Sequence, residues 1–342
     1  MRVHQILSGA GPYDAVTEQA QAFRGYFRGW GWTGTDAAAR MDPRLGKEFV
    51  PLGELRPGAG DILLIHYSGY APRLRRSLEF DNRKLVISHN ITPARWFWDH
   101  DPMAAVSCAL GRKQLPEFAA AADLTAGVSL FNARELGSET VIPILFDPSI
   151  LGAPASPPDP AGPPTVLFVG RLSPHKRQDA VIRAFALYRR RHAPDARLVL
   201  VGRPVNDTFG AAIRDLADEL APGAVSIEQG VTRAALAEHY RAAHAFLCLS
   251  EHEGFCIPLL EAFHFRVPVI ARAVGGIPEV AGDAALLLGG DDDERVAAEL
   301  LALVVGDAQL RATMRERGAK RVAAYAPEPT ARALRAALES LR

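Results

Sequence analysis

The chain has 342 residues, of which 48% are apolar and 23% charged, and this composition excludes an intrinsically disordered protein. The length exceeds what one hydrophobic core usually organises, so we expect two domains with a cleft between them. The 39 basic residues balance the 39 acidic residues, which excludes a general electrostatic attraction to nucleic acid or acidic membranes.

The cysteines and the apolar stretches indicate in which cellular compartment we expect the protein. Cys108, Cys248 and Cys256 show neither a zinc-binding spacing nor an even set for disulfide bonds. The start of the sequence lacks a signal-peptide pattern, and no apolar run reaches transmembrane length. We therefore expect a cytoplasmic protein in a reducing environment.

Apolar stretches that predict strands alternate with predicted helices in the first half of the chain. The strands are expected at HQIL (4–7), DILLIHY (61–67), LVIS (85–88), LTAGVSL (124–130) and TVIPIL (140–145). Helices are expected to begin near Asp14, Pro72 and Gln114. This alternation predicts a parallel sheet with helices on both faces, the doubly wound arrangement.

Ligands of such sheets bind outside the carboxyl ends of the strands, so the loops after the strands are the places to search for a site. Gly9 and Gly11 follow the first strand, and with Asp14 they are candidates to face a ligand. The segment is an incomplete dinucleotide fingerprint without its third glycine, which argues against a nicotinamide enzyme. His66 and Asn90 also follow strands, and each is either a ligand contact or a polar group satisfied at a strand end.

The segment from Gly152 to Pro164 differs from its surroundings because it is dense in Pro, Gly and Ala, and we interpret it as a linker. Beyond it, strands are predicted at VLFVG (166–170), LVLVG (198–202), VSIEQG (225–230), AFLCLS (245–250) and VPVIA (267–271). We therefore predict a first domain over 1–151, a linker over 152–164 and a second domain over 165–322. The helix over 323–342 either completes the second domain or packs back on the first.

Two segments of the second half carry candidate chemistry. In SEHEGFCIPLLEAF (250–263), Pro258 suits the first turn of a helix, whose N-terminal amides attract anions. Glu261 can then accept hydrogen bonds from a ribose diol and Glu253 can face a sugar ring; the alternative is helix-dipole complementation and a solvated glutamate. In VGRLSPHK (169–176), Arg171 and Lys176 can hold a diphosphate, or they belong to a solvated basic turn.

One enzyme family has four segments like these in the same order. They are the two segments above, LVLVG (198–202) and VPVIARAVGGIPEVAGDAALLL (267–288). From Val166 to Leu288 the chain resembles the C-terminal domain of retaining glycosyltransferases of family four. The resemblance implies the α/β GT-B fold, two Rossmann-like domains that face each other across a cleft. It implies that the domain over 1–151 binds the acceptor, with His66 and Asn90 as candidate contacts, and that the domain over 165–322 binds the nucleotide sugar. The chain departs from the family at Cys256, where a second glycine is common, and at His264 and Phe265, where small residues are common.

The resemblance assigns roles to the candidate residues. It implies that Arg171 and Lys176 bind the donor diphosphate, that Glu253 contacts the donor sugar at the reacting centre, and that Glu261 binds the nucleotide ribose. Further donor contacts are implied for the segment after Glu253, through Gly254, Phe255, Cys256 and Ile257. His89 matches a position where histidine contacts the donor sugar or its phosphate. Gly275, Gly276 and Glu279 also match, but a turn and a helix cap explain them.

The implied reaction moves a sugar from a nucleotide diphosphate sugar, UDP- or GDP-linked, to a hydroxyl of a glycan or glycolipid, with retained anomeric configuration. The resemblance implies no metal and no cofactor. A sugar phosphorylase, a nucleotide-sugar epimerase or a non-catalytic glycan-binding subunit are the alternatives. The sequence leaves the oligomeric state open.

A basic cluster in the first half permits two interpretations. Arg73, Arg75, Arg76, Arg83 and Lys84 lie close together, interrupted by Glu79 and Asp81. The cluster is either a solvated face, which we favour, or a contact with anionic lipid that holds the protein at the inner face of the membrane.

Overall fold

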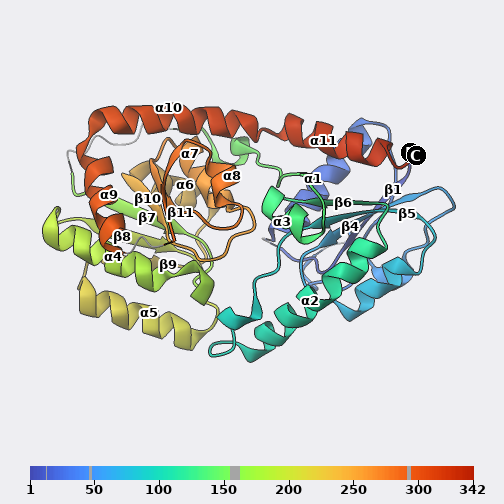
Figure 1. The fold of residues 1–342 in the computed structure, drawn as a ribbon, viewed down its shortest axis with the longest axis horizontal. Helices are drawn as coiled ribbons and strands as arrows, with labels where there is room; N and C mark the ends of the chain where they lie inside the picture. The colour runs from blue at the N-terminus through green and yellow to red at the C-terminus, as the bar shows by residue number, and fades with distance from the viewer. Residues whose placement is uncertain (13, 46–47, 155–161, 291–293) are drawn as a thin grey trace. The chain divides into compact units, whose positions relative to one another are not determined.

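A computed structural model describes residues 1–12, 14–45, 48–154, 162–290 and 294–342. The chain divides into two compact units (Figure 1). The first unit contains residues 1–98, 102–145 and 327–342, and the second contains residues 99–101 and 146–326. Among the described residues, no helix combines the length and apolar character needed to cross a membrane.

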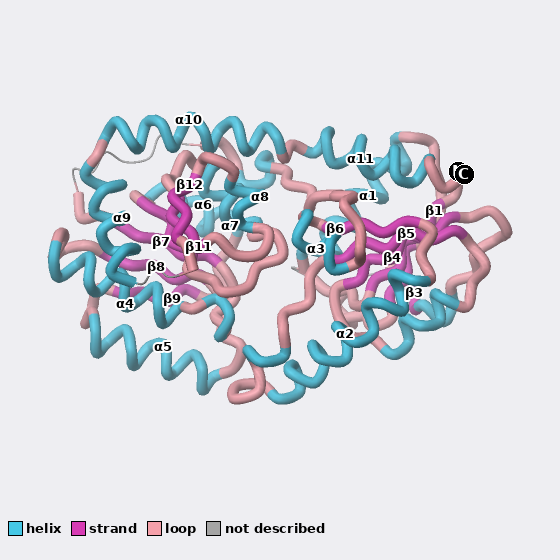
Figure 2. The backbone as a smooth tube through the Cα atoms, viewed as in Figure 1, coloured by secondary structure: helices cyan, strands magenta, loops and turns pink. Residues whose placement is uncertain are grey.

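The first unit is built on a six-stranded parallel sheet in the order β3-β2-β1-β4-β5-β6 (Figure 2). Its strands are β1 (Val3–Leu7), β2 (Asp36–Ala38), β3 (Val50–Pro51), β4 (Ile62–Tyr67), β5 (Arg83–Ser88) and β6 (Leu124–Gly127). β1 and β4 lie side by side with Val3 opposite Ile62 and Leu7 opposite His66. Buried side chains cover both faces of these central strands, as the apolar runs predict.

Helices cover the two faces of this sheet. α2 (Pro102–Ala120) packs on one face through Leu115 and Phe118, and α1 (Ala15–Gly29) packs on the other. A short helix, α3 (Leu130–Glu135), follows β6. The C-terminal helix α11 (Pro327–Glu339) belongs to this unit, where the Arg335 guanidinium lies 5.4 Å from the ring centre of Trp30.

The second unit repeats the plan with a parallel sheet in the order β12-β11-β10-β7-β8-β9. The strands are β7 (Thr165–Val169), β8 (Arg197–Val201), β9 (Val225–Glu228), β10 (Ala245–Cys248), β11 (Val269–Arg272) and β12 (Ala285–Leu288). The helices are α4 (Gln178–Arg191), α5 (Asp207–Leu220), α6 (Arg233–Ala242), α7 (Ile257–His264), α8 (Ile277–Ala281), α9 (Glu294–Gly306) and α10 (Ala308–Ala324).

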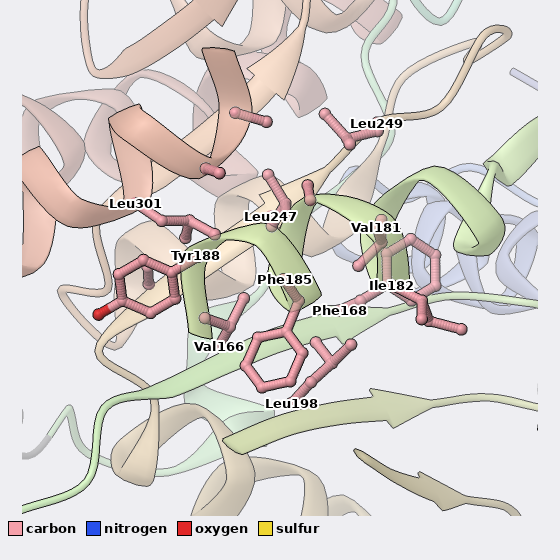
Figure 3. Close-up of a cluster of buried hydrophobic side chains, with 14 of the residues drawn as sticks. Val166, Phe168, Val181, Ile182, Phe185, Tyr188, Leu198, Leu247, Leu249 and Leu301 are labelled. Atoms are coloured by element: carbon pink, nitrogen blue, oxygen red, sulfur yellow. The ribbon is translucent and has the colours of Figure 1, made fainter. Parts of the chain in front are cut away.

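The core of the second unit lies between its sheet and the helices α4, α5 and α9. Figure 3 shows Phe185 of α4 among side chains of β7 and β8, including Phe168 and Leu198. Along β10 the side chains alternate, so that Leu247 joins this core while Phe246 stacks on Tyr240 of α6 on the other face.

The structure corrects several expected elements of the first half. TVIPIL forms no strand; Val141 makes an isolated bridge to Gly127, and Pro143 has no N–H to extend a ladder. LTAGVSL is a strand only to Gly127, because Ser129 caps α3 with a side chain that accepts from the Asn132 amide.

The helices expected near Pro72 and Gln114 also differ. The segment Pro72–Leu78 is a 3₁₀ helix, and the helix around Gln114 already begins at Pro102. β2 and β3 were not expected because they are only three and two residues long. The expected linker lies partly outside the described residues, and the domain boundaries drawn from the sequence stay a prediction.

Candidate active site

Two loops of the second unit meet where the neighbouring strands β7 and β10 end. From this pair the sheet continues to β8 and β9 on one side and to β11 and β12 on the other, so the strand order reverses here. Open α/β sheets bind ligands at such switch points, outside the carboxyl ends of the strands. The backbone N–H of Glu251 donates to the carbonyl of His175 at 2.8 Å, which ties the two loops together.

The loops bring Lys176 and Glu253 into direct contact. The Lys176 ammonium lies 2.5 Å from Oε1 of Glu253, and the Ser250 hydroxyl donates to the same oxygen at 2.8 Å. Only 7% of the Glu253 side chain and 19% of the Lys176 side chain are exposed. Burial opposes the charge on Lys176, but the Glu253 carboxylate outweighs it and raises the pKa of the ammonium. Lys176 is therefore a fixed cation with one side open to solvent.

His175, which sequence analysis did not single out, lies buried beside this pair. Burial lowers its pKa to about 3, and the positive charges of Lys176 and Arg171 and the nearby His252 act in the same direction. At neutral pH this imidazole carries no charge. The loop around Lys176 thus places its positive charge on the lysine and arginine and not on the histidine.

The second predicted cation, Arg171, has an exposed side chain. Its backbone is held by Gln178, whose side-chain amide donates to the Arg171 carbonyl at 3.1 Å. In the part of the chain that the structure describes, its guanidinium has no hydrogen bond or ion pair. The structure therefore leaves Arg171 available to an anion, and it does not join this side chain to Glu253 or Glu261.

Gly275 supports the backbone of Glu253 from a third loop. A Cβ at this position would lie 1.9 Å from the Glu253 carbonyl oxygen, and its φ of +56° is one that side-chain-bearing residues rarely adopt. The next amide, of Gly276, donates to the same carbonyl at 3.0 Å. Gly275 therefore does more than form the turn that we inferred from the sequence, since it allows a close approach that positions Glu253, and the Gly276 amide adds a hydrogen bond.

Glu261 lies in α7 and is held by Tyr240 of α6. The Tyr240 hydroxyl donates to Oε2 of Glu261 at 2.7 Å. The Tyr240 ring also stacks on Phe265, with ring centres 5.4 Å apart and planes inclined by 8°. Burial and the Glu261 carboxylate raise the pKa of Tyr240 well above its usual value, so its hydroxyl keeps its proton and stays a donor. Tyr240 thereby orients the carboxylate that we expect to bind a ribose.

The segment before α7 presents backbone amides as the sequence suggested. Cys256 has φ +73° and serves as the N-cap, with no side chain capping the helix. Among the described residues, the amides of Phe255, Cys256 and Ile257 have no hydrogen-bond acceptor. The Phe255 ring is buried against Tyr325 with ring centres 5.4 Å apart, and Gly254 precedes it in the same turn. These amides are candidates to bind an anion or sugar oxygens.

Cys248, Glu253 and Cys256 are buried with their ligand atoms within 4.8 Å of one another. Two sulfurs and one carboxylate oxygen form a donor set that a soft divalent cation accepts. Glu253 already binds the Lys176 ammonium, so a cation would first displace that contact. The expected absence of a metal stays a prediction.

His66 and His89 of the first unit, which were predicted as site residues, are hydrogen-bonded to each other. Nδ1 of His66 lies 3.0 Å from Nε2 of His89, and Nε2 of His66 lies 3.0 Å from the side-chain oxygen of Gln5. The Gln5 amide nitrogen donates to Asp36 at 2.9 Å, and Asp36 forms an ion pair with Arg24. Polar side chains thus form a continuous chain from Arg24 to His89.

This geometry fixes the protons on both imidazoles. The Gln5 nitrogen has two acceptors, Asp36 and the Ala20 carbonyl, so its oxygen must face His66 and accept. His66 therefore carries its proton on Nε2. Burial lowers the pKa of His66 well below the usual value, so its Nδ1 is bare and accepts from Nε2 of His89.

His89 is left with a buried, bare Nδ1. Burial lowers its pKa to about 3, so the ring is neutral at physiological pH and its one proton is on Nε2. In the described part of the chain no group donates to Nδ1. An unpaired buried acceptor at the carboxyl end of β5 fits a hydroxyl or N–H donor, and its lone pair would repel a phosphate oxygen.

The other candidates of the first unit have structural partners. The Gly11 amide donates to the Thr17 hydroxyl at 3.1 Å, and Asp14 caps α1 by accepting from the Thr17 amide at 2.8 Å. Asn90 has φ +75°, and its side-chain oxygen accepts from Asn132 at 3.2 Å. Gly9 lies beside the Arg40 side chain. The capping bonds engage Gly11 and Asp14, which we expected to face a ligand.

Comparison with known proteins shows a likeness of the second unit to one family. Residues 153–321 match the sequence model of the family described as glycosyl transferases group 1. The match spans just under half of the chain, and it shows what this segment is similar to. The matched range contains every residue of the Lys176–Glu253 site described above.

Curated relatives share part of the chain. D-inositol 3-phosphate glycosyltransferase of Kineococcus radiotolerans is 32% identical over 51% of this chain and 43% of its own length. The enzyme of the same name from Nocardiopsis dassonvillei is 36% identical over 41% of this chain and 35% of its own length. The chain therefore matches less than half the length of these relatives.

Solved structures resemble the whole chain. Sucrose-phosphate synthase from Thermosynechococcus elongatus superposes with a TM-score of 0.77 at 18% identity and covers 100% of this chain and 99% of its own. Anabaena Alr3699/HepE in complex with UDP and glucose gives 0.73 at 16% identity, covering 99% and 100%. At these identities the likeness concerns the fold, and it confirms GT-B with two Rossmann-like domains. The cleft between them stays a prediction.

Replacement of Gly275 by Ala tests the close approach at Glu253. The left-handed backbone costs a non-glycine residue about 1 kcal/mol, and overpacking adds roughly 1–3 kcal/mol. We expect the free energy of unfolding in urea to fall by roughly 2–4 kcal/mol. Gly223→Ala is the control, because Gly223 has φ +67° with nothing near its missing Cβ. Equal losses for the two variants would contradict a role for the contact with Glu253.

The proton assignment predicts a spectroscopic result. In ¹⁵N-histidine NMR spectra, His66 and His89 should both appear as neutral Nε2–H tautomers between pH 5 and 8. In Gln5→Leu the acceptor for His66 is lost, so the Nε2–H tautomer of His89 should lose population. Gln114→Leu is the control, since this buried glutamine bonds to Tyr67 instead. An Nδ1–H tautomer of His89 in the parent protein would refute the assignment.

Proposed function

We propose that the protein is a retaining glycosyltransferase that moves a sugar from a nucleotide diphosphate sugar to a hydroxyl acceptor. The observation that carries this proposal is the buried Lys176–Glu253 pair at the switch point of a unit similar to the group 1 glycosyl transferases. A fixed cation and an acid at the place where nucleotides bind suit a reaction in which a diphosphate leaves a sugar.

The donor is proposed to be UDP- or GDP-linked. Alr3699/HepE, which shares the fold, was solved with UDP-glucose, which supports a uridine nucleotide. The curated relatives are named for D-inositol 3-phosphate, which supports a polyol phosphate as an acceptor besides the glycan or glycolipid expected from the sequence.

In the proposed reaction Lys176 and Arg171 bind the diphosphate and neutralise the negative charge that grows as the sugar leaves. Glu261, oriented by Tyr240, accepts from the ribose hydroxyls, and Glu253 faces the sugar. The bond from the anomeric carbon to the phosphate oxygen breaks, and the acceptor oxygen bonds to that carbon from the same face. The acceptor proton passes to the departing phosphate, so no protein nucleophile is needed. The bare Nδ1 of His89 accepts from a hydroxyl of a substrate.

The experiment that tests the proposal has two stages. Calorimetric titration with UDP, GDP, ADP and CDP identifies the nucleotide, and hydrolysis of the matching nucleotide sugars identifies the sugar. Transfer is then measured with a panel of hydroxyl acceptors, and NMR of the product gives the anomeric configuration. Failure to bind any nucleoside diphosphate would refute the proposal. Turnover that requires free inorganic phosphate would favour a phosphorylase.

Lys176→Ala should lower turnover by roughly a hundredfold, because about 2.7 kcal/mol of transition-state charge stabilisation is lost. The measurement is kcat for transfer with saturating donor. The control is Lys320→Ala, which removes an exposed lysine paired with Glu316 at 2.8 Å. Transfer by the Lys176 variant at the parent rate would reject the role of this residue.

Glu261→Gln should weaken the binding of the nucleoside diphosphate. The amide accepts hydrogen bonds less strongly than the carboxylate, so we expect the Kd for the nucleoside diphosphate to rise roughly tenfold. Tyr240→Phe keeps the stacked ring and removes the orienting hydroxyl, and it should raise Kd by a smaller factor. Unchanged affinity in Glu261→Gln would show that this carboxylate does not contact the ribose.

A further inference from the structure

The first unit contains a cavity of about 520 Å³ to which the proposed reaction assigns no substrate group. Its walls come from the segments that follow β2 and β4, together with Pro51 of β3, so it opens at the carboxyl edge of the sheet. Small and apolar side chains form most of the lining. The long polar side chains are Arg40, Tyr70 and Arg73, and none of the described residues that line the cavity is acidic.

Arg73 differs from Arg75, Arg83 and Lys84 of the basic cluster found in the sequence. The Arg75 guanidinium pairs with Glu117 at 2.8 Å, and Arg83 pairs with Asp123 at 2.5 Å. Lys84 donates to the carbonyls of Phe80 and Asn82. Within the described residues, by contrast, the Arg73 side chain has no ion pair or hydrogen bond. Carboxylates therefore neutralise Arg75 and Arg83. The Arg73 guanidinium, which has no partner among the described residues, lines the cavity, whereas Arg76 does not.

Arg40 supplies a second guanidinium without a partner among the described residues. Its backbone is fixed, because its carbonyl accepts from the Ala10 amide at 2.9 Å. Its side chain passes beside Gly9, where a Cβ would lie 3.5 Å from the guanidinium. The carboxylate of Asp42, two residues further on, binds Arg44 at 2.7 Å and does not neutralise Arg40. The cavity therefore carries two positive charges that the described residues leave unpaired.

We propose that this cavity binds a phosphate or carboxylate group on the acceptor. Guanidinium groups bind such anions through paired hydrogen bonds, and the Tyr70 hydroxyl is a further donor. The apolar walls then contact the carbon skeleton of the acceptor, and a volume of about 520 Å³ suits a small molecule. This inference rests on the proposed function, since it assigns the chemical class of the acceptor.

Matched acceptors test the proposal in the full chain. Transfer is compared for inositol phosphate and inositol, and for glucose 6-phosphate and glucose, with Arg40→Gln, Arg73→Gln and the control Arg75→Gln. We expect the parent to prefer the phosphorylated member of a pair. Each cavity variant should raise KM for that member by roughly 10- to 100-fold, with little change for the neutral member. Arg75→Gln should behave as the parent.

A binding measurement tests this inference separately from the proposed function. Inositol phosphate is titrated calorimetrically without donor, so the measurement needs no turnover. Binding that Arg40→Gln and Arg73→Gln abolish, and Arg75→Gln preserves, supports the site even if no transfer is found. Donor hydrolysis by the cavity variants at the parent rate shows that the nucleotide site is intact. Equal effects on phosphorylated and neutral acceptors, or equal effects of Arg75→Gln and Arg73→Gln, would overturn the proposal.

The anion can belong to a free small molecule or to a lipid headgroup. Sedimentation with vesicles of phosphatidylinositol or phosphatidylcholine distinguishes the two sources. Binding to the phosphatidylinositol vesicles that depends on Arg40 and Arg73 assigns the cavity to a lipid-linked acceptor. Binding to soluble inositol phosphate alone assigns it to a free one. Binding to neither would overturn the assignment of an anion to this cavity.

Discussion

The ion pair between Lys176 and Glu253 is the contact on which the rest of the second unit's site depends. Two charges buried at the end of a sheet are stable only together, because removing one leaves the other uncompensated at a cost of about 3–5 kcal/mol. Three loops converge to satisfy this condition: one carries the lysine, one carries the glutamate and Ser250, and one carries Gly275. Because Ser250 also bonds the carboxylate, an entering diphosphate can share Lys176 without stranding Glu253.

The two units share the same sheet plan, but the polar groups at the ends of their strands differ in charge. In the second unit Lys176 stays charged and the adjacent His175 stays neutral, which suits an anionic ligand. In the chain of hydrogen bonds that ends at His89 in the first unit, the charges lie at the far end, in the Arg24–Asp36 pair. The imidazoles at the other end are neutral, and the chain ends in a bare acceptor on His89. A hydroxyl group fits that end better than a phosphate does.

Sequence alone predicted the parts of the molecule that depend on local pattern. The apolar runs of the central strands and the residues placed after them follow from periodicity and strand ends, which is why Lys176 and Glu253 could be named in advance. Tyr240 and Gln5 could not, because each acts on a residue far away in the sequence. Gly275 was named only for a turn, because its contact with the Glu253 carbonyl also spans a long stretch of sequence. The wrong strand at TVIPIL has a local cause, since apolar content favoured a strand while Pro143 removed a ladder donor.

Burial of its side chain accounts for a residue other than glycine at position 256. Cys256 holds φ +73° at the start of α7, a conformation that costs a side-chain-bearing residue about 1 kcal/mol. Its side chain is buried, and its sulfur lies within 4.8 Å of that of Cys248. Burial of a thiol offsets strain of this size, since each buried methylene-sized group contributes about 0.8 kcal/mol. Gly275 has no such compensation available, because the Glu253 carbonyl occupies the space where its side chain would lie.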